Sequence, residues 1–434
     1  MVSSAPAPGS DTPSGTRTAL WAVVAAFGTY FSMYMFRKPF TAATYDGLSA
    51  FGIDLKTALV TGQIFGYFLS KLIGIKVVSE MPPQRRAAAI FLLILASEGA
   101  LALFGMIPPP WNVACLFLNG LPLGMVFGLV VSFLEGRKLT ELLTTGLCVS
   151  FILADDVAKA LGQGLLDRNV PPFWMPATAG LIALVPLSLF VWMLSRIPAP
   201  TAEDEAARSQ RTPMSAVDRR QLCSKYAVGI GAIVLAFVVT TVLRSIRADF
   251  SAELWRGLGE TTTPHLYAAS GMLISLGVLL VCGLTVLVRD NRQAFFLSLW
   301  ICLAGFGLLL GAIAAHETGR LGPMATMVLF GLGPYLPYVA IHTTVFERML
   351  AMTREKGTLA FLMTLSDSAG YMGYIAVMLG RKVITRQGNI LTFFEWVSGG
   401  LAIISITALF VAMQYFARRR EVVEPTLIPS PATP

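Results

Sequence analysis

Long apolar segments follow one another along nearly the whole chain, separated by short polar connections. Segments of about 20 residues are long enough for a helix to cross a hydrocarbon core of about 30 Å. Because backbone groups in lipid must be hydrogen-bonded within helices, and because the alternating segments of an outer-membrane barrel do not occur, the pattern indicates a helical bundle. Hydropathy and helix-breaking residues predict twelve helices, at 17–46, 53–79, 85–107, 111–138, 141–166, 173–196, 222–250, 262–288, 292–316, 321–351, 355–381 and 389–418.

Composition supports this prediction. The 434 residues are 55% hydrophobic and 13% charged, whereas a soluble globular protein carries about 25% charged residues. A water-soluble globular domain is therefore excluded. The expected fold class is an all-α membrane protein with twelve transmembrane helices in two six-helix, pseudo-symmetric halves.

Polar segments divide the chain into five parts. The long polar connection 197–221 is predicted to be a cytoplasmic linker between an N-terminal half at 17–196 and a C-terminal half at 222–420, with disordered tails at 1–16 and 421–434. Lys and Arg are concentrated in the connections on the side of the two termini, which predicts cytoplasmic termini in the inner (plasma) membrane. This topology accounts for the net charge of +8, so no nucleic-acid partner is expected.

The two halves share a weak internal repeat at an offset of 212 residues. Two of the matching positions are acidic, and acids are scarce in this chain, so duplication is the favoured interpretation. Parallel repeats of this kind are typical of transporters that rock one half against the other around a midplane site. The matching pairs are Pro122 and Pro334, Glu135 and Glu347, Leu153 and Leu365, and Asp155 and Asp367.

Two arginines are the leading candidates for substrate binding. Arg37 lies well inside the first predicted helix and Arg244 inside the seventh. An ionisable group near a bilayer centre costs at least about 2.5 kcal/mol, and two guanidinium forks from opposite halves suit the oxygens of a phosphate or carboxylate. The alternative is that nearby aspartates neutralise both arginines and only fix the packing. The neighbouring Lys38 and Arg247 are expected to snorkel toward the outer mouth.

Other side chains are expected to complete the substrate site. Lys71 in the second helix is a further candidate cation, although snorkelling is an alternative. Tyrosines offer a hydroxyl and an apolar ring to a polar organic molecule, although each taken singly is more often a packing residue. Those assigned to the site are Tyr34, Tyr67 and Tyr371, within a larger aromatic layer.

A second group is assigned to ion pairing or to coupling. Asp155, Asp156 and Lys159 share one helix at spacings that allow internal pairs, and a buried carboxylate that carries a coupling proton is the alternative. Asp367 belongs to the same group. His342 is expected to be a buried core imidazole, with a proton relay as the alternative.

Short charged connections are candidates for a cytoplasmic gate. Opposite charges there can hold the inner face closed and must separate for release. The residues are Glu80, Arg85, Asp290 and Arg292.

No cofactor, metal site or enzymatic activity is expected. The five cysteines show no metal-ligand spacing and are interpreted as buried apolar residues. No glycine-rich phosphate loop or nucleophile–base arrangement is present in the sequence.

With twelve helices and a repeated half, the chain resembles a major facilitator superfamily transporter. Three stretches, 34–40, 66–71 and 242–244, resemble signatures of the organophosphate:phosphate antiporter family. The resemblance implies that Arg37 and Arg244 bind a phosphoryl group and that Lys71 assists. The sequence departs from the family where a histidine is expected, near Asp155 and Asp156.

These observations predict a secondary active transporter of a small organic anion, with a phosphorylated compound favoured, that works as a monomer by alternating access in the lipid bilayer. Proton coupling is an alternative to anion exchange. Two other functions stay open: a proton-coupled transporter of cationic or zwitterionic compounds that uses the intramembrane aspartates, and a ligand sensor that keeps the transporter fold without flux.

Overall fold

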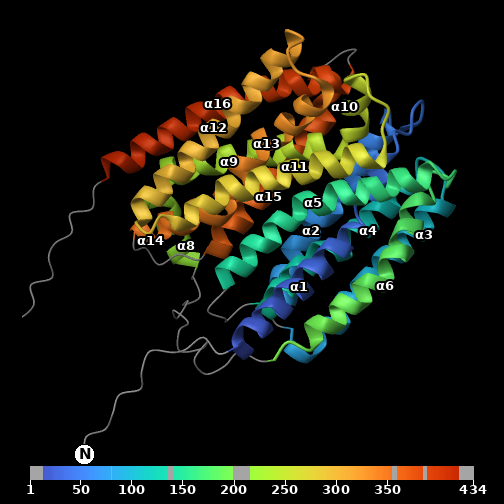
Figure 1. Ribbon diagram of the computed structural model, residues 1–434, viewed down its shortest axis with the longest axis horizontal. Helices are drawn as coiled ribbons and strands as arrows, with labels where there is room; N and C mark the ends of the chain where they lie inside the picture. Colours follow the sequence, from blue (N-terminus) through green and yellow to red (C-terminus); the bar gives the residue numbers. More distant parts are fainter. Residues whose placement is uncertain are drawn as a thin grey trace, which may run out of the picture.

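The computed structural model describes residues 13–79, 81–134, 140–198, 216–353, 359–384 and 389–419, and these are almost entirely helical (Figure 1). The N-terminal set of elements is α1 (Pro13–Tyr34), η1 (Pro39–Ala42), β1 (Ser49–Ala50), β2 (Ile53–Asp54), α2 (Leu55–Ser79), α3 (Pro83–Met106), α4 (Asn112–Leu134), α5 (Thr140–Leu166) and α6 (Met175–Ser195). The C-terminal set is α8 (Ala216–Lys225), α9 (Ala227–Asp249), α10 (Ser251–Gly257), α11 (Pro264–Gly283), η2 (Leu284–Leu287), α12 (Asn291–Glu317), α13 (Pro323–Ala340), η3 (Ile341–Val345), α14 (Phe346–Thr353), α15 (Leu359–Ile384) and α16 (Ile390–Arg418).

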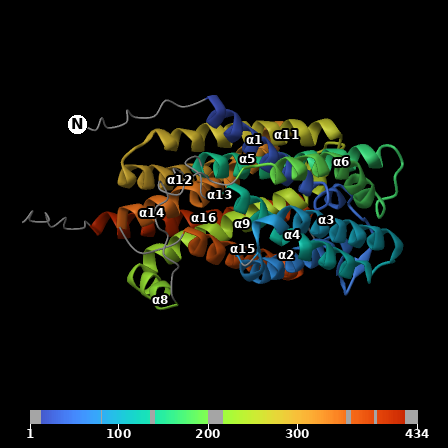
Figure 2. The same cartoon turned by 90° about the horizontal axis from the view of Figure 1, so that it is seen from below.

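The two sets lie side by side, with their helices roughly parallel to one long axis (Figures 1 and 2). Most packing is within each set, and the main contacts between sets are made by α5 with α11 and by α2 with α15. One end of the bundle carries the β1–β2 hairpin and α10, and the other carries α8 and α14. We call these the hairpin end and the α8 end.

The described helices fit a protein that crosses a membrane several times. Eight of them are long and apolar enough to span a bilayer. Exposed tryptophans form a belt near each end, as expected where rings meet the lipid headgroups. The residues are Trp111, Trp174 and Trp396 toward the hairpin end and Trp21, Trp192 and Trp300 toward the α8 end.

The central helices are less apolar because they carry charges. Three of the four helices that make the main contacts between the sets, α2, α5 and α15, are absent from the eight apolar spans and contain Lys71, Asp155, Asp156, Lys159 and Asp367. The twelve-helix count is therefore not confirmed by apolarity alone.

Glycines allow α2 and α4 to pack at backbone distance. A Cβ atom at Gly66 would lie 2.2 Å from the carbonyl oxygen of Phe117, and one at Gly120 would lie 2.2 Å from that of Gln63. Any larger residue at either position would push the two helices apart. Small residues are common at the contacts between membrane helices for the same reason.

Three predicted helices are interrupted. The helix predicted at 17–46 ends at Tyr34. Pro39 has no backbone N–H to extend it, and the chain continues as the 3-10 helix η1. The helix predicted at 321–351 contains the π-helical segment η3, and the one predicted at 222–250 is divided between α8 and α9 at Tyr226. In the repeat, α4 and α13 do contain the matching Pro122 and Pro334.

Buried amide side chains stabilise the interruption of α1. Asn119 Nδ2 donates to the carbonyl oxygen of Phe36 at 3.0 Å, and Gln63 Nε2 donates to that of Arg37 at 2.9 Å. Gln63 also donates to Asn119 Oδ1 at 2.8 Å, and Ser97 Oγ lies 2.6 Å from Asn119 Nδ2. Irregular backbone at membrane depth requires such partners, so this network fixes the segment that carries Arg37.

We expect Asn119→Ala to lower the thermal unfolding temperature of the purified protein. The substitution removes the donor to Phe36 and leaves buried polar groups unpaired, at a cost of about 1–3 kcal/mol for each. Asn112→Ala is the matched control, because Asn112 is equally buried at the start of the same helix and its side-chain amide has no hydrogen-bond partner among the described residues. Equal unfolding temperatures for the two variants would show that the network does not hold the interruption in place.

Candidate functional site

A small cavity lies between the two sets of helices and is lined by both candidate arginines. Its volume is about 20 Å³, room for one or two water molecules but not for an organic substrate. The interrupted segment after α1 supplies Arg37 and α9 supplies Arg244. The other lining residues are Tyr34, Lys38, Ile64, Phe151, Asp155, Ser245, Ala248, Asp249, Tyr335, Tyr338 and Tyr371.

Neither arginine has a carboxylate partner among the described residues. Arg37 is 6% exposed and Arg244 is partly buried, and the Nε atom of each is buried without a hydrogen-bond acceptor among the described residues. The guanidinium groups rest on aromatic rings instead, with Cζ of Arg37 3.9 Å from the centroid of Tyr67 and Cζ of Arg244 4.1 Å from that of Tyr338. Cation–π contact compensates a desolvated cation only partly, so both groups are available to an anion.

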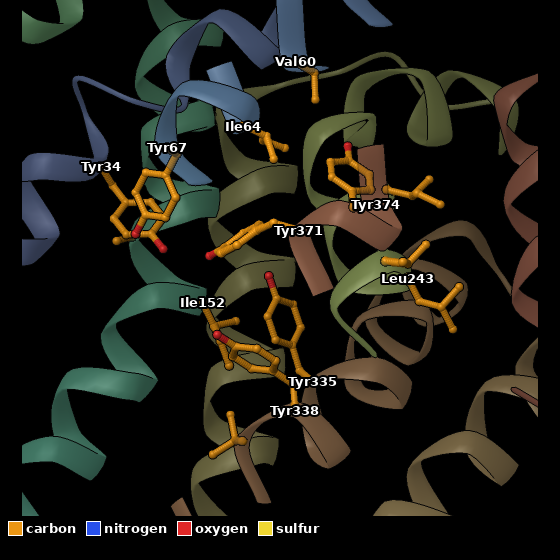
Figure 3. Close-up of a cluster of buried hydrophobic side chains, with 14 of the residues drawn as sticks. Tyr34, Val60, Ile64, Tyr67, Ile152, Leu243, Tyr335, Tyr338, Tyr371 and Tyr374 are labelled. Atoms are coloured by element: carbon orange, nitrogen blue, oxygen red, sulfur yellow. The ribbon is translucent and has the colours of Figure 1, made fainter. Parts of the chain in front are cut away.

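Tyrosines from both sets surround this cavity. Figure 3 shows Tyr34 and Tyr67 facing Tyr371, Tyr335 and Tyr338, with the hydroxyl groups of the last three directed into the space between the sets. The rings of Tyr67 and Tyr371 meet edge to face, with their centroids 5.6 Å apart. Tyr34 and Tyr371 line the cavity directly, whereas Tyr67 supports Arg37 from behind.

The sequence left open that nearby aspartates neutralise the two arginines. In the structure, Asp155 and Asp156 are bound to other cations. Lys159 Nζ lies 2.6 Å from Asp155 Oδ2 and 2.9 Å from Asp156 Oδ1. Arg247 Nη1 lies 2.9 Å from Asp156 Oδ2, which joins α9 to α5. These pairs leave Arg37 and Arg244 as positive charges without a partner among the described residues.

Lys38 and Arg247 do not snorkel, contrary to the expectation from sequence. Lys38 is 7% exposed and pairs with Asp249 and, at 3.4 Å, with Asp155, and Arg247 is 1% exposed. The expectation was wrong because aspartates from the opposite set of helices compensate both cations inside the protein. Neither side chain has to reach the membrane interface.

Lys71 lies at the contact between the sets and does not line the cavity. It forms an ion pair with Asp367 that joins α2 to α15, and its Nζ lies 5.2 Å from the centroid of Tyr371. Since Asp367 is occupied in this way, neither residue is free to bind a substrate in this arrangement.

His342 is buried in the π-helical segment η3, a type of irregularity that is frequent at functional sites. Its ring stacks between Phe237 and Tyr338, at centroid distances of 5.7 and 5.3 Å. Because Tyr338 in turn supports Arg244, the imidazole packs behind the cavity wall. Its Nδ1 atom has no hydrogen-bond partner among the described residues.

Sequence reasoning missed several charged residues at the hairpin end. Lys56 is fully buried, 2.7 Å from Glu253 Oε2, and joins α2 to α10. Asp249, at the end of α9, binds Lys38 and accepts a 2.9 Å hydrogen bond from the hydroxyl of Tyr374. Their positions near predicted helix ends gave no indication of burial.

One ion pair between the sets is exposed. Arg256 Nη1 lies 2.8 Å from Asp46 Oδ2, and both side chains are more than half exposed. The hydrogen bond from Arg256 lowers the pKa of the Asp46 carboxyl below its usual value. The ion pair is therefore intact above the usual pKa of aspartate and weakens as the pH falls below that value. Its loss has little effect on stability, because solvent screens an exposed ion pair.

The three predicted gate residues within the described part of the chain form no ion pair with one another there, and the gate stays a prediction. Asp290 accepts a 2.7 Å hydrogen bond from the backbone N–H of Gln293 and caps α12, while Arg292 donates to the carbonyl oxygen of Ala417 at 3.2 Å. Arg85 is exposed at the start of α3. Glu80 lies outside the described residues. Within those residues, no group of three His, Cys, Asp or Glu side chains is placed to hold a metal.

Solved structures share this fold. The chain is similar to a D-xylose–proton symporter (TM-score 0.60, 13% identity, 91% of this chain and 97% of that one) and to the nucleoside transporter NupG (0.63, 13%, 92% and 99%). It is also similar to a bacterial homologue of the human lysosomal transporter Spinster in an inward-facing, unoccupied conformation (0.56, 13%, 94% and 96%). These neighbours are transporters, and the likeness shows that the chain shares their helical fold. None of these three is an organophosphate:phosphate antiporter, and that narrower resemblance stays a prediction.

No curated protein matches the chain by sequence. A family match covers residues 39–419, from η1 to the end of α16, and leaves out α1 and the cavity residues Tyr34, Arg37 and Lys38. The chain belongs to the family of unknown function DUF5690.

Proposed function

We propose that the protein is a secondary transporter of a small organic anion, with a phosphorylated compound favoured, and that Arg37 and Arg244 bind the anionic group. The observation that carries the proposal is the pair of guanidinium groups that line one cavity and have no carboxylate partner among the described residues. Two such charges match a dianion, and a tetrahedral phosphoryl group offers enough oxygens to accept from both forks.

The topology that goes with this function is also a proposal. It comprises twelve crossings, moving halves at 17–196 and 222–420, cytoplasmic termini and a monomer in the plasma membrane. Support comes from the central position of the charged helices and from the fold shared with known transporters. Substrate entry requires the cavity to widen, since about 20 Å³ does not accommodate an organic molecule.

A transporter of cations that uses the intramembrane aspartates is less well supported. Asp155, Asp156 and Asp367 each hold a basic side chain of the protein, so a substrate cation would have to displace Lys159, Arg247 or Lys71. A ligand sensor with the same fold differs from the proposal only in showing binding without flux.

We expect Arg37→Gln and Arg244→Gln each to weaken binding of inorganic phosphate by about 10- to 100-fold, because each removes charge-assisted hydrogen bonds worth about 1.5–3 kcal/mol. The measurement is the phosphate dependence of the unfolding temperature of the purified protein, followed by uptake into proteoliposomes.

Arg196→Gln is the matched control, because Arg196 is exposed beyond the end of α6 and stacks on Trp192 away from the cavity. Wild-type phosphate stabilisation in both cavity variants would refute the two-arginine site. Binding in the wild type without uptake would favour the sensor.

A second prediction concerns the hairpin end, where the buried pair of Lys38 and Asp249 joins the two sets of helices. We expect Asp249→Asn to let the two sets separate there more often, because the substitution removes the main partner of Lys38. Loss of one partner of a buried pair costs about 3–5 kcal/mol. The measurement is the labelling rate of the cavity position Ser245→Cys by a membrane-impermeant thiol reagent, with the five native cysteines replaced.

Asp46→Asn is the control for that experiment, since its exposed pair with Arg256 contributes about 0–1 kcal/mol. The rate should rise several-fold with Asp249→Asn and change little with Asp46→Asn. Similar rates in all three proteins would show that the buried pair does not keep the hairpin end closed.

A further inference from the structure

One buried acid of the N-terminal set plays no part in the ion pairs described above. Glu98 on α3 is 8% exposed, and its Oε2 atom is buried without a hydrogen-bond donor among the described residues. The other buried carboxylates of the central region each have a basic partner, as Asp155, Asp249 and Asp367 illustrate. Glu98 has none among the described residues.

The surroundings of Glu98 are specific and uncharged. A Cβ atom at Gly180 of α6 would lie 2.0 Å from Glu98 Oε2 and 3.0 Å from the ring of Phe36. The carboxyl group of Glu98 therefore occupies space that is free only because residue 180 is a glycine. On α4, Asn119 donates to Ser97, the residue that precedes Glu98. No titratable or charged side chain faces Glu98 from the segment after α1, from α4 or from α6 within the described residues.

Phe36 connects this acid to the substrate site. It belongs to the interruption of α1, its carbonyl oxygen is held by Asn119, and the next residue is Arg37. Glu98 therefore packs against the segment that positions one of the two arginines. A shift of this segment relative to α3 and α6 changes the surroundings of the carboxyl group.

An ionised carboxylate without a cation or donor is costly in such surroundings, whereas the neutral acid is tolerated. We propose that Glu98 is a proton-binding site that is occupied in the closed arrangement and releases its proton when the segment carrying Arg37 moves. Carboxylate and aqueous proton combine to give the acid, and the reverse step returns the proton to water. The link to anion transport rests on the proposed function, but the proton site itself does not.

Infrared difference spectroscopy of the purified protein tests the proton site without any substrate. Between about pH 5 and about pH 9, the wild type should lose a protonated-carboxyl band that Glu98→Gln lacks at every pH. Glu395→Gln is the control, because Glu395 is a partly buried acid that has His316 as a partner, at 3.6 Å. This control should retain the band.

If Glu98→Gln does not fold, Glu98→Asp replaces it. The shorter side chain withdraws the carboxyl group from Gly180, so the band should remain and titrate at a different pH. Identical spectra for the wild type and Glu98→Gln, or an unshifted titration in Glu98→Asp, would overturn the assignment of a proton to Glu98.

Sulfate binding tests the link to the anion, because sulfate is a tetrahedral dianion throughout this pH range. If the anion binds the arrangement in which Glu98 is protonated, sulfate affinity falls with rising pH in the wild type, by up to about tenfold per pH unit. In Glu98→Gln it should be nearly independent of pH. The same pH dependence in both proteins would refute the link.

The two proposals fail in different ways. If sulfate and phosphate do not bind the wild type at any pH, the anion site fails, and the infrared result alone decides the proton site. If both anions bind and require Arg37 while Glu98→Gln changes neither the spectra nor the pH dependence, the anion site stands and the proton site fails.

Discussion

Two positively charged side chains between the two sets of helices have no carboxylate partner among the described residues, and the rest of the structure depends on this constraint. Arg37 and Arg244 come from opposite sets, and each rests on a tyrosine ring. A desolvated guanidinium group is costly unless something compensates it. The nearby aspartates do not, because lysines and Arg247 occupy them. Under the proposed function, an anion that joins the two sets would compensate both charges.

The ion pairs around the cavity indicate how such an anion controls access. Toward the hairpin end, the sets are joined by Lys38 with Asp249, Arg247 with Asp156 and Lys56 with Glu253. Toward the α8 end, among the described residues, Lys71 with Asp367 joins them. An anion can shift the balance between two states only through a difference in its affinity for them. Under the proposed function, closure of both arginines on one oxyanion would supply that difference.

Much of the fold followed from the sequence, because apolar segments of about 20 residues are a strong signal for membrane helices. The interruption of α1 was not predicted, although Pro39 marked it, since the apolar run continues on both sides of the proline. Burial of Lys56 and Asp249 could not be predicted either, because pairing across the two sets joins residues about two hundred positions apart. The structure places Arg37 and Arg244 on one cavity and pairs Lys71 with Asp367, and their roles in binding stay predictions.

The most direct test of the account is a double-mutant cycle on phosphate affinity, using Arg37→Gln, Arg244→Gln and the double variant. If both guanidinium groups bind one anion, the two substitutions are strongly non-additive, because either one alone already breaks the bridge between the sets. Additive losses would place the arginines at separate sites, and unchanged affinity in all three variants would contradict the account altogether.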